Sequence, residues 1–131
     1  MRILIVDDEA ACRALLALSL RPHGTVEQVG DGSEAIAAIA LSLSEKKPYS
    51  LILLDITMPG IDGQTALRTI RLMEQKHGLA VGKGAKIIMT TVQGDKEHIL
   101  AAFRECAEGY LLKPIDAAKL TSLLTSLGLI S

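Results

Sequence analysis

Aromatic residues are scarce in this chain of 131 residues: tryptophan is absent, and the aromatic side chains are Tyr49, Phe103 and Tyr110. The hydrophobic fraction is nevertheless 49%, so the core must be aliphatic, built from Leu, Ile, Val and Ala. A chain of this length can bury one such core. No repeat or linker interrupts it, so we expect residues 1–131 to form a single domain.

The chain also lacks an excess of either charge, because its 14 Lys and Arg residues nearly balance its 15 Asp and Glu residues. No basic cluster indicates a nucleic-acid surface. No apolar run approaches the roughly 18 residues that a membrane-spanning helix needs. Acidic residues begin at Asp7, which is incompatible with a secretory signal. We therefore expect a cytoplasmic protein without nucleic-acid or membrane partners.

Cysteine is nearly absent too. Cys12 and Cys106 lie far apart, form no CxxC motif and have no histidine at metal-ligand spacing. This pattern predicts two small buried thiols in a reducing compartment, and it disfavours a disulfide or a zinc site.

Short apolar segments alternate with longer segments of helical periodicity. The predicted strands are residues 3–6, 25–29, 51–54, 86–89 and 110–112. Their length and branched residues are typical of strands buried on both faces. Apolar residues at helical spacing predict helices near residues 9–20, 36–43, 64–76, 99–106 and 120–127, and Asp62 is a predicted cap of the third. The alternation predicts an α/β fold, a doubly wound parallel sheet of five strands between layers of helices.

Polar residues follow these strands at their carboxyl ends. Asp7 and Asp8 follow the first strand, and Asp55 follows the third. Thr91 comes after the fourth strand and Lys113 after the fifth. Ligands of doubly wound sheets bind outside the carboxyl ends of the strands. We therefore expect these side chains to converge at one edge of the sheet.

Three neighbouring carboxylates either raise one another's pKa or recruit a cation. An oxygen-rich site of this kind suits Mg²⁺ or Mn²⁺, especially beside a phosphate. We assign Asp8 and Asp55 as direct ligands, and Asp7 as a direct or water-bridged one. The Thr57 carbonyl is a further predicted ligand. Lys113 supplies a positive charge that can pair with Asp55.

Four motifs together resemble the receiver domains of bacterial two-component response regulators. They are VDDE at 6–9, LLDITMPGIDG at 53–63, TT at 90–91 and GYLLKP at 109–114. Each alone is weak, but their order and their places at strand ends make the resemblance specific, and it covers almost the whole chain. It implies a flavodoxin-like three-layer sandwich with strand order 2-1-3-4-5 and five helices.

The resemblance also implies roles for individual residues. Asp55 matches the phosphoacceptor, which takes a phosphoryl group from a phosphohistidine with Mg²⁺ and Lys113 neutralising charge. Thr91 matches the switch hydroxyl and Tyr110 the switch aromatic, whereas we expect Thr90 only to pack in its strand. Lys113–Pro114 matches a cis peptide bond.

Three residues flank the expected path of the hydrolytic water. Thr57 lies two residues after the phosphoacceptor, and Gln93 lies two after the switch threonine. Neither is an acid or base able to activate water. Val92 is bulkier than the alanine often found in relatives. We therefore expect a long-lived phosphoryl group.

The resemblance implies a sensor histidine kinase or a histidine phosphotransfer protein as partner. The expected output surface is the fourth helix, fifth strand and fifth helix, about residues 95–127, which would bind a downstream protein. We expect a stand-alone receiver of the chemotaxis-regulator type with no output domain. A receiver cut from a longer regulator or hybrid kinase would have the same sequence features.

Two other functions compete with a phosphorylation switch. A pseudo-receiver would use this fold as a binding module without phosphorylation, but such modules usually lose one or more of the motif residues. A phosphohydrolase with an aspartyl intermediate would share Asp55 and Mg²⁺, yet it normally has a second acid where Thr57 stands. We therefore expect a signalling phosphoprotein that promotes its own phosphorylation and dephosphorylation, not an enzyme with a separate substrate.

Overall fold

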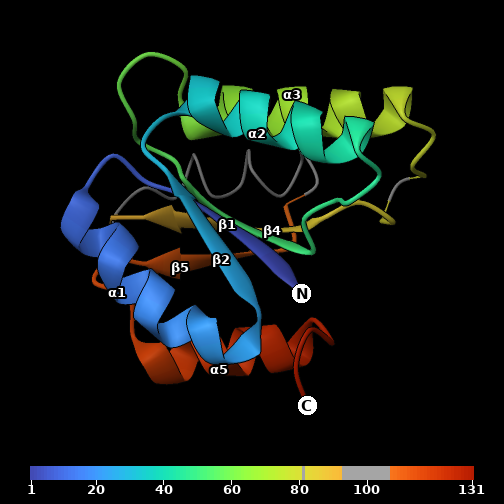
Figure 1. The fold of residues 1–131 in the computed structure, drawn as a ribbon. Helices are drawn as coiled ribbons and strands as arrows, with labels where there is room; N and C mark the ends of the chain where they lie inside the picture. Colours follow the sequence, from blue (N-terminus) through green and yellow to red (C-terminus); the bar gives the residue numbers. More distant parts are fainter. Residues whose placement is uncertain (81, 93–106) are drawn as a thin grey trace.

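One five-stranded parallel sheet forms the centre of the protein (Figure 1). The computed structural model describes residues 1–80, 82–92 and 107–131. The strand order is β2-β1-β3-β4-β5, as predicted. The strands are β1 (Arg2–Val6), β2 (Thr25–Val29), β3 (Leu51–Asp55), β4 (Lys86–Thr91) and β5 (Gly109–Leu112).

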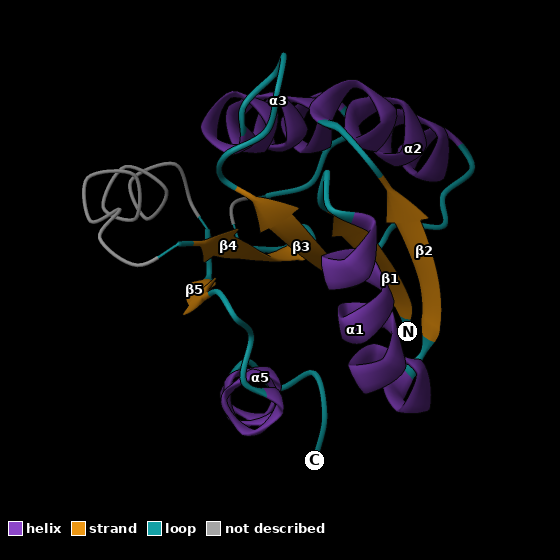
Figure 2. Cartoon of the chain, turned by 90° about the vertical axis from the view of Figure 1, so that its left-hand side faces the viewer, coloured by secondary structure: helices purple, strands orange, loops and turns teal. Residues whose placement is uncertain are grey.

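Helices cover both faces of this sheet, which confirms the predicted three-layer fold. The described part of the chain contains α1 (Ala10–Leu20), α2 (Gly32–Ser44), α3 (Gly63–Lys76) and α5 (Ala117–Ser126), with a short 3-10 helix η1 (Arg21–His23). Helices α2 and α3 lie on one face, and α1 and α5 lie on the other (Figure 2). The predicted fourth helix lies outside the described residues. Over the ranges the structure describes, no helix is both long enough and apolar enough to span a membrane.

Two aliphatic cores flank the sheet, because successive residues of a strand point to opposite faces. Leu4 of β1 and Ile52 of β3 are buried against α2 and α3. Their neighbours Ile3 and Leu51 are buried against α1 and α5. Full burial of one such side chain contributes about 1.5–3 kcal/mol. The cores therefore fix the central strands whose ends carry the acidic residues.

The prediction that every strand is buried on both faces is wrong for the two edges. Strand β2 is only partly buried, and in β5 the exposed Tyr110 and Leu112 alternate with buried Gly109 and Leu111. An edge strand has a neighbour on one side only, so fewer side chains cover it. Helix α2 also differs, since Ala35 is fully buried whereas the predicted Ile36 is only partly buried.

The ends of β3 and β4 extend beyond the predicted boundaries. Asp55 pairs with Thr90 in the ladder, and Thr91 is the last residue of β4. These polar residues therefore belong to the strands instead of following them. Backbone pairing continues regardless of side-chain polarity, which the apolar pattern could not show.

Among the helices that the structure describes, three have an aspartate as the N-cap residue. The side chains of Asp31 and Asp62 accept hydrogen bonds of 2.8 Å from backbone N–H groups three residues ahead. Asp116 caps α5 in a similar way, and the predicted role of Asp62 is confirmed. Helix α1 differs, because Glu9 occupies its N-cap without a side-chain cap hydrogen bond.

Candidate functional site

Three aspartates meet at the carboxyl edge of the sheet. The register places Val6 of β1 opposite Leu54 of β3, so the residues that follow them, Asp7 and Asp55, lie side by side. One carboxylate oxygen from each of Asp7, Asp8 and Asp55 lies within 4.8 Å of the other two. The convergence predicted for these three residues is therefore present.

Lys113 lies among these carboxylates. Its Nζ atom is 3.0 Å from Asp7 Oδ2 and 3.1 Å from Asp55 Oδ2. A third contact of 3.7 Å reaches the exposed carboxylate of Glu9, which the sequence analysis did not assign to the site. Asp7 is 0% exposed and Asp55 is 3% exposed. One ammonium group therefore faces several carboxylates, two of them buried.

The acidic cluster has carboxylate oxygens that could bind a cation. Asp7 Oδ1 accepts a hydrogen bond from the Glu9 N–H at 2.9 Å, and Asp55 Oδ1 accepts one from the Thr57 N–H at 3.2 Å. Asp7 Oδ2 is buried, yet no described residue gives it a hydrogen bond, although it pairs electrostatically with Lys113. Hard oxygen ligands with unused lone pairs suit Mg²⁺ or Mn²⁺. The residues present therefore fit such an ion.

Burial and charge separate the acidity of the two buried aspartates. Burial raises the pKa of Asp55 to about 6, because the opposing attraction of Lys113 is weaker and Asp7 adds repulsion. Burial also acts to raise the pKa of Asp7, but the Glu9 N–H, the Cys12 thiol and the positive charge of Lys113 together outweigh it and lower the pKa. Adjacent carboxylates with different proton affinities are typical of functional sites.

Cys12 is a neighbour of the site that the sequence analysis treated only as packing. Its thiol is half-buried, and burial together with Asp7 raises its pKa to about 12. The group therefore remains a neutral thiol at physiological pH. The other cysteine, Cys106, lies outside the described residues. The sequence could have indicated Cys12 by its place one helical turn beyond Asp8.

The predicted switch residues lie along β4 and β5. Thr91 is 1% exposed, and its hydroxyl donates to the Val92 carbonyl at 3.3 Å. The Lys113 N–H donates to the Thr91 carbonyl at 2.7 Å, which joins the end of β4 to the residue that pairs with Asp55. The Lys113–Pro114 peptide bond is cis. Thr91 and Lys113 therefore belong to one continuous polar edge.

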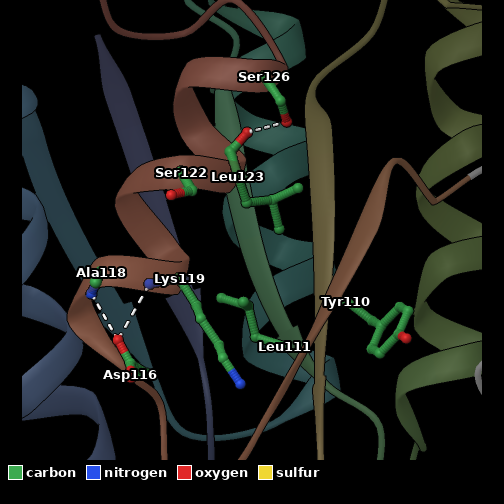
Figure 3. A pocket seen from close by; sticks show the side chains of 8 residues that line it. All are labelled: Tyr110, Leu111, Asp116, Ala118, Lys119, Ser122, Leu123 and Ser126. Carbon is green, nitrogen blue, oxygen red and sulfur yellow. Dashed lines mark hydrogen bonds between the residues drawn. The ribbon is translucent and has the colours of Figure 1, made fainter.

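Tyr110 lies on β5 with 42% of its surface exposed. Its ring points away from a shallow groove of about 520 Å³ between β5 and α5 (Figure 3). Leu111 and Leu123 contribute apolar surface to this groove, and Asp116 caps α5 at its edge (Figure 3). The groove belongs to the part of the predicted output surface that the structure describes.

The structure describes two of the three residues predicted to flank the path of the hydrolytic water. Thr57 is exposed beside Asp55, and Val92 is 57% exposed. Gln93 lies outside the described residues. Thr90 is 1% exposed, in keeping with the packing role expected of it.

A family model for the response regulator receiver domain matches residues 3–125. The chain belongs to the response regulator receiver domain family. It is 36% identical over 116 residues to the transcriptional regulatory protein ResD of Bacillus subtilis, a match that covers 88% of this chain and 42% of ResD. The receiver domain thus spans less than half the length of this relative. The predicted family and its place in two-component signal transduction are confirmed.

Solved structures support the same assignment for the receiver domain. Chemotaxis protein CheY4 of Vibrio cholerae is 26% identical with a TM-score of 0.77, and the match covers 96% of this chain and 97% of CheY4. The receiver domain of the histidine kinase CKI1 of Arabidopsis thaliana is 26% identical with a TM-score of 0.83, covering 97% of this chain and 89% of that one. That structure was determined as a complex with Mg²⁺ and BeF₃⁻.

Proposed function

We propose that Asp55 is the phosphoacceptor of this receiver domain. The observation that carries the proposal is its environment: a buried carboxylate at the carboxyl edge, 3.1 Å from Lys113 Nζ and clustered with Asp7 and Asp8. Receiver domains interact with histidine kinases or histidine phosphotransfer proteins. The donor of this chain is accordingly a phosphohistidine on such a protein.

The transfer forms one bond and breaks one. A carboxylate oxygen of Asp55 attacks phosphorus, and the P–N bond of the phosphohistidine breaks. The electron pair of that bond remains on the imidazole nitrogen, which then takes a proton. Lys113 stabilises negative charge on the phosphoryl oxygens. A divalent ion held by Asp7, Asp8, Asp55 and the Thr57 carbonyl would supply further positive charge for the same oxygens.

Phosphorylation acts on the partner surface through β4 and β5. The hydroxyl of Thr91 leaves the Val92 carbonyl and binds a phosphoryl oxygen, and Tyr110 turns inward from its exposed position. The phosphoryl group biases this equilibrium only through its different contacts with the two arrangements. The altered surface, which includes the β5–α5 groove, binds the downstream protein.

The phosphoryl group is long-lived in this proposal. Thr57, exposed beside Asp55, has no acidic or basic group that could activate water. Val92 narrows the approach of water to the site. Gln93 likewise has no acidic or basic group that could activate water. A fast loss of the phosphoryl group from isolated protein, unchanged by substitutions at Thr57 or Gln93, would contradict it.

Intact mass after incubation with Mg²⁺ and a small acyl phosphate tests the proposal. Wild type is expected to gain one phosphoryl group, while Asp55→Asn or added chelator prevents the gain. A folded protein that gains no mass with any donor would favour the phosphorylation-independent binding module. Release of phosphate from many unrelated monoesters would favour a phosphohydrolase.

A further inference from the structure

Arg13 of α1 contacts the backbone of the acidic cluster. Its Nη1 atom donates a hydrogen bond to the carbonyl oxygen of Asp7. The half-buried guanidinium also lies close to the turn between β2 and α2, since a Cβ atom added to Gly30 would be 3.5 Å from Nη1. Arg13 therefore contacts the end of β1 and lies beside the turn between β2 and α2.

The carbonyl that Arg13 holds belongs to the peptide between Asp7 and Asp8. Because this peptide is planar, a hydrogen bond to its carbonyl restrains the two backbone torsions that flank it, ψ of Asp7 and φ of Asp8, and these torsions set the directions of the two side chains. Other bonds hold Asp7, whose N–H donates to the Val29 carbonyl at 3.2 Å. The exposed Asp8 carboxylate receives no hydrogen bond from the residues that the structure describes. Its orientation consequently depends on the peptide that Arg13 holds.

We propose that Arg13 is a positioning residue for the divalent ion of the receiver site. It orients the Asp7–Asp8 peptide so that both carboxylates face Asp55. This inference rests on the proposed function, because it assumes that the cluster binds Mg²⁺. Positioning partners of metal ligands typically change metal affinity by about 10–100-fold when they are removed.

Charge alone predicts the opposite effect. A guanidinium close to a cation site repels the cation, so removing its charge would strengthen Mg²⁺ binding if Arg13 acted only by electrostatics. Loss of positioning would weaken binding instead. The direction of the change in affinity therefore distinguishes the two roles.

Calorimetric titration of the full chain with Mg²⁺ tests the inference. Arg13→Met is expected to weaken Mg²⁺ affinity about tenfold, and Arg13→Lys, which keeps a donor, is expected to recover part of it. Arg21→Met is the matched control, because Arg21 is exposed in η1 beyond the other end of α1. Circular dichroism verifies that each variant is folded.

Unchanged or tighter Mg²⁺ binding by folded Arg13→Met would overturn the positioning role. If that variant does not fold, Arg13→Leu removes the same charge and the same hydrogen-bond donors and is judged by the same two outcomes. Absence of Mg²⁺ binding by wild type would overturn the proposed metal site itself. Failure of the inference is thus distinct from failure of the proposed function.

Discussion

The two ends of the sheet treat charged side chains differently. At the amino end, Arg71 of α3 contacts Glu74 at 2.7 Å and Glu108 at 2.8 Å. Both carboxylates also accept backbone hydrogen bonds, Glu74 from Ala85 at 2.8 Å and Glu108 from Ile87 at 2.7 Å. At the carboxyl end, Lys113 is the common ion-pair partner of several carboxylates, which repel one another.

The two clusters differ in whether their buried carboxylates have all the partners they need within the protein. The amino-end cluster joins α3 to the start of β4 and to the residue before β5, and both carboxylates have hydrogen-bond donors within the cluster. The carboxyl-end cluster leaves Asp7 Oδ2 without a hydrogen bond from any described residue. Buried charge without full compensation lowers stability unless a ligand supplies the missing partner.

Breaking the amino-end cluster should have the largest effect on stability. Arg71→Met leaves the carboxylate of Glu74, which is 6% exposed, without its cation. We expect a loss of about 3–5 kcal/mol in the free energy of unfolding, measured by urea denaturation. Lys76→Met, on the exposed end of the same helix, should change it by less than about 0.5 kcal/mol. Equal effects of the two substitutions would show that the ion pairs of Arg71 do not contribute to the free energy of unfolding.

Adding a cation should remove the imbalance at the carboxyl end. With Mg²⁺ at a hundredfold excess over its dissociation constant, the free energy of unfolding of wild type should rise by about 2.7 kcal/mol. Asp8→Asn should reduce this gain without unfolding the protein, because Asp8 is exposed. The measurement is thermal unfolding over a range of Mg²⁺ concentrations. A gain that persists in full in Asp8→Asn would place the ion elsewhere.

Neutralising Asp55 should stabilise the metal-free protein. The folded-state pKa of Asp55, about 6, lies above its ordinary value of 3.8, so the folded protein binds this proton more tightly than the unfolded chain does. The contribution of Asp55 to stability is therefore present below about pH 4 and is lost as the pH rises toward 6. At pH 7, Asp55→Asn should be more stable than wild type by on the order of 2 kcal/mol.

Unfolding of both proteins from pH 4 to pH 8, without metal, tests this expectation. The difference should grow up to about pH 6 and then level off, since Asp55 is ionised above its pKa. A constant difference across this range would show that Asp55 does not titrate as described. In Asp55→Asn, Lys113 still forms its ion pair with Asp7, so the substitution does not leave the lysine without an acidic partner.

The smallest effect should come from the rim of the site. The Glu9 side chain is 69% exposed and lies 3.7 Å from Lys113 Nζ. Exposed ion pairs contribute roughly 0–1 kcal/mol, so Glu9→Gln should change the free energy of unfolding by less than about 1 kcal/mol. Urea denaturation at low and high salt measures this. A large, salt-independent loss would show that Glu9 belongs to the buried part of the cluster.

The acidic site was predictable from sequence because each of its residues is adjacent to an apolar strand. The strand order implied by the resemblance to receiver domains then places β1 beside β3, which brings Asp7 and Asp55 together. The amino-end cluster gave no such indication, since Arg71 and Glu108 come from distant segments and no periodicity links them. The exposure of β2 and β5 was missed for a related reason, because a strand's place at an edge depends on the whole topology.

The backbone at Asp55 is held in place by close packing against Gly63, the first residue of α3. A Cβ atom on Gly63 would lie 2.2 Å from the carbonyl oxygen of Asp55, so the first turn of α3 rests directly on the end of β3. The Gly63 N–H also donates to the Ile56 carbonyl at 2.9 Å. These two contacts couple the end of β3 to the first turn of α3, so the backbone at Asp55 cannot shift without displacing α3. A conformational change at Asp55 that leaves α3 in place would therefore involve neighbouring strands and not the end of β3 itself.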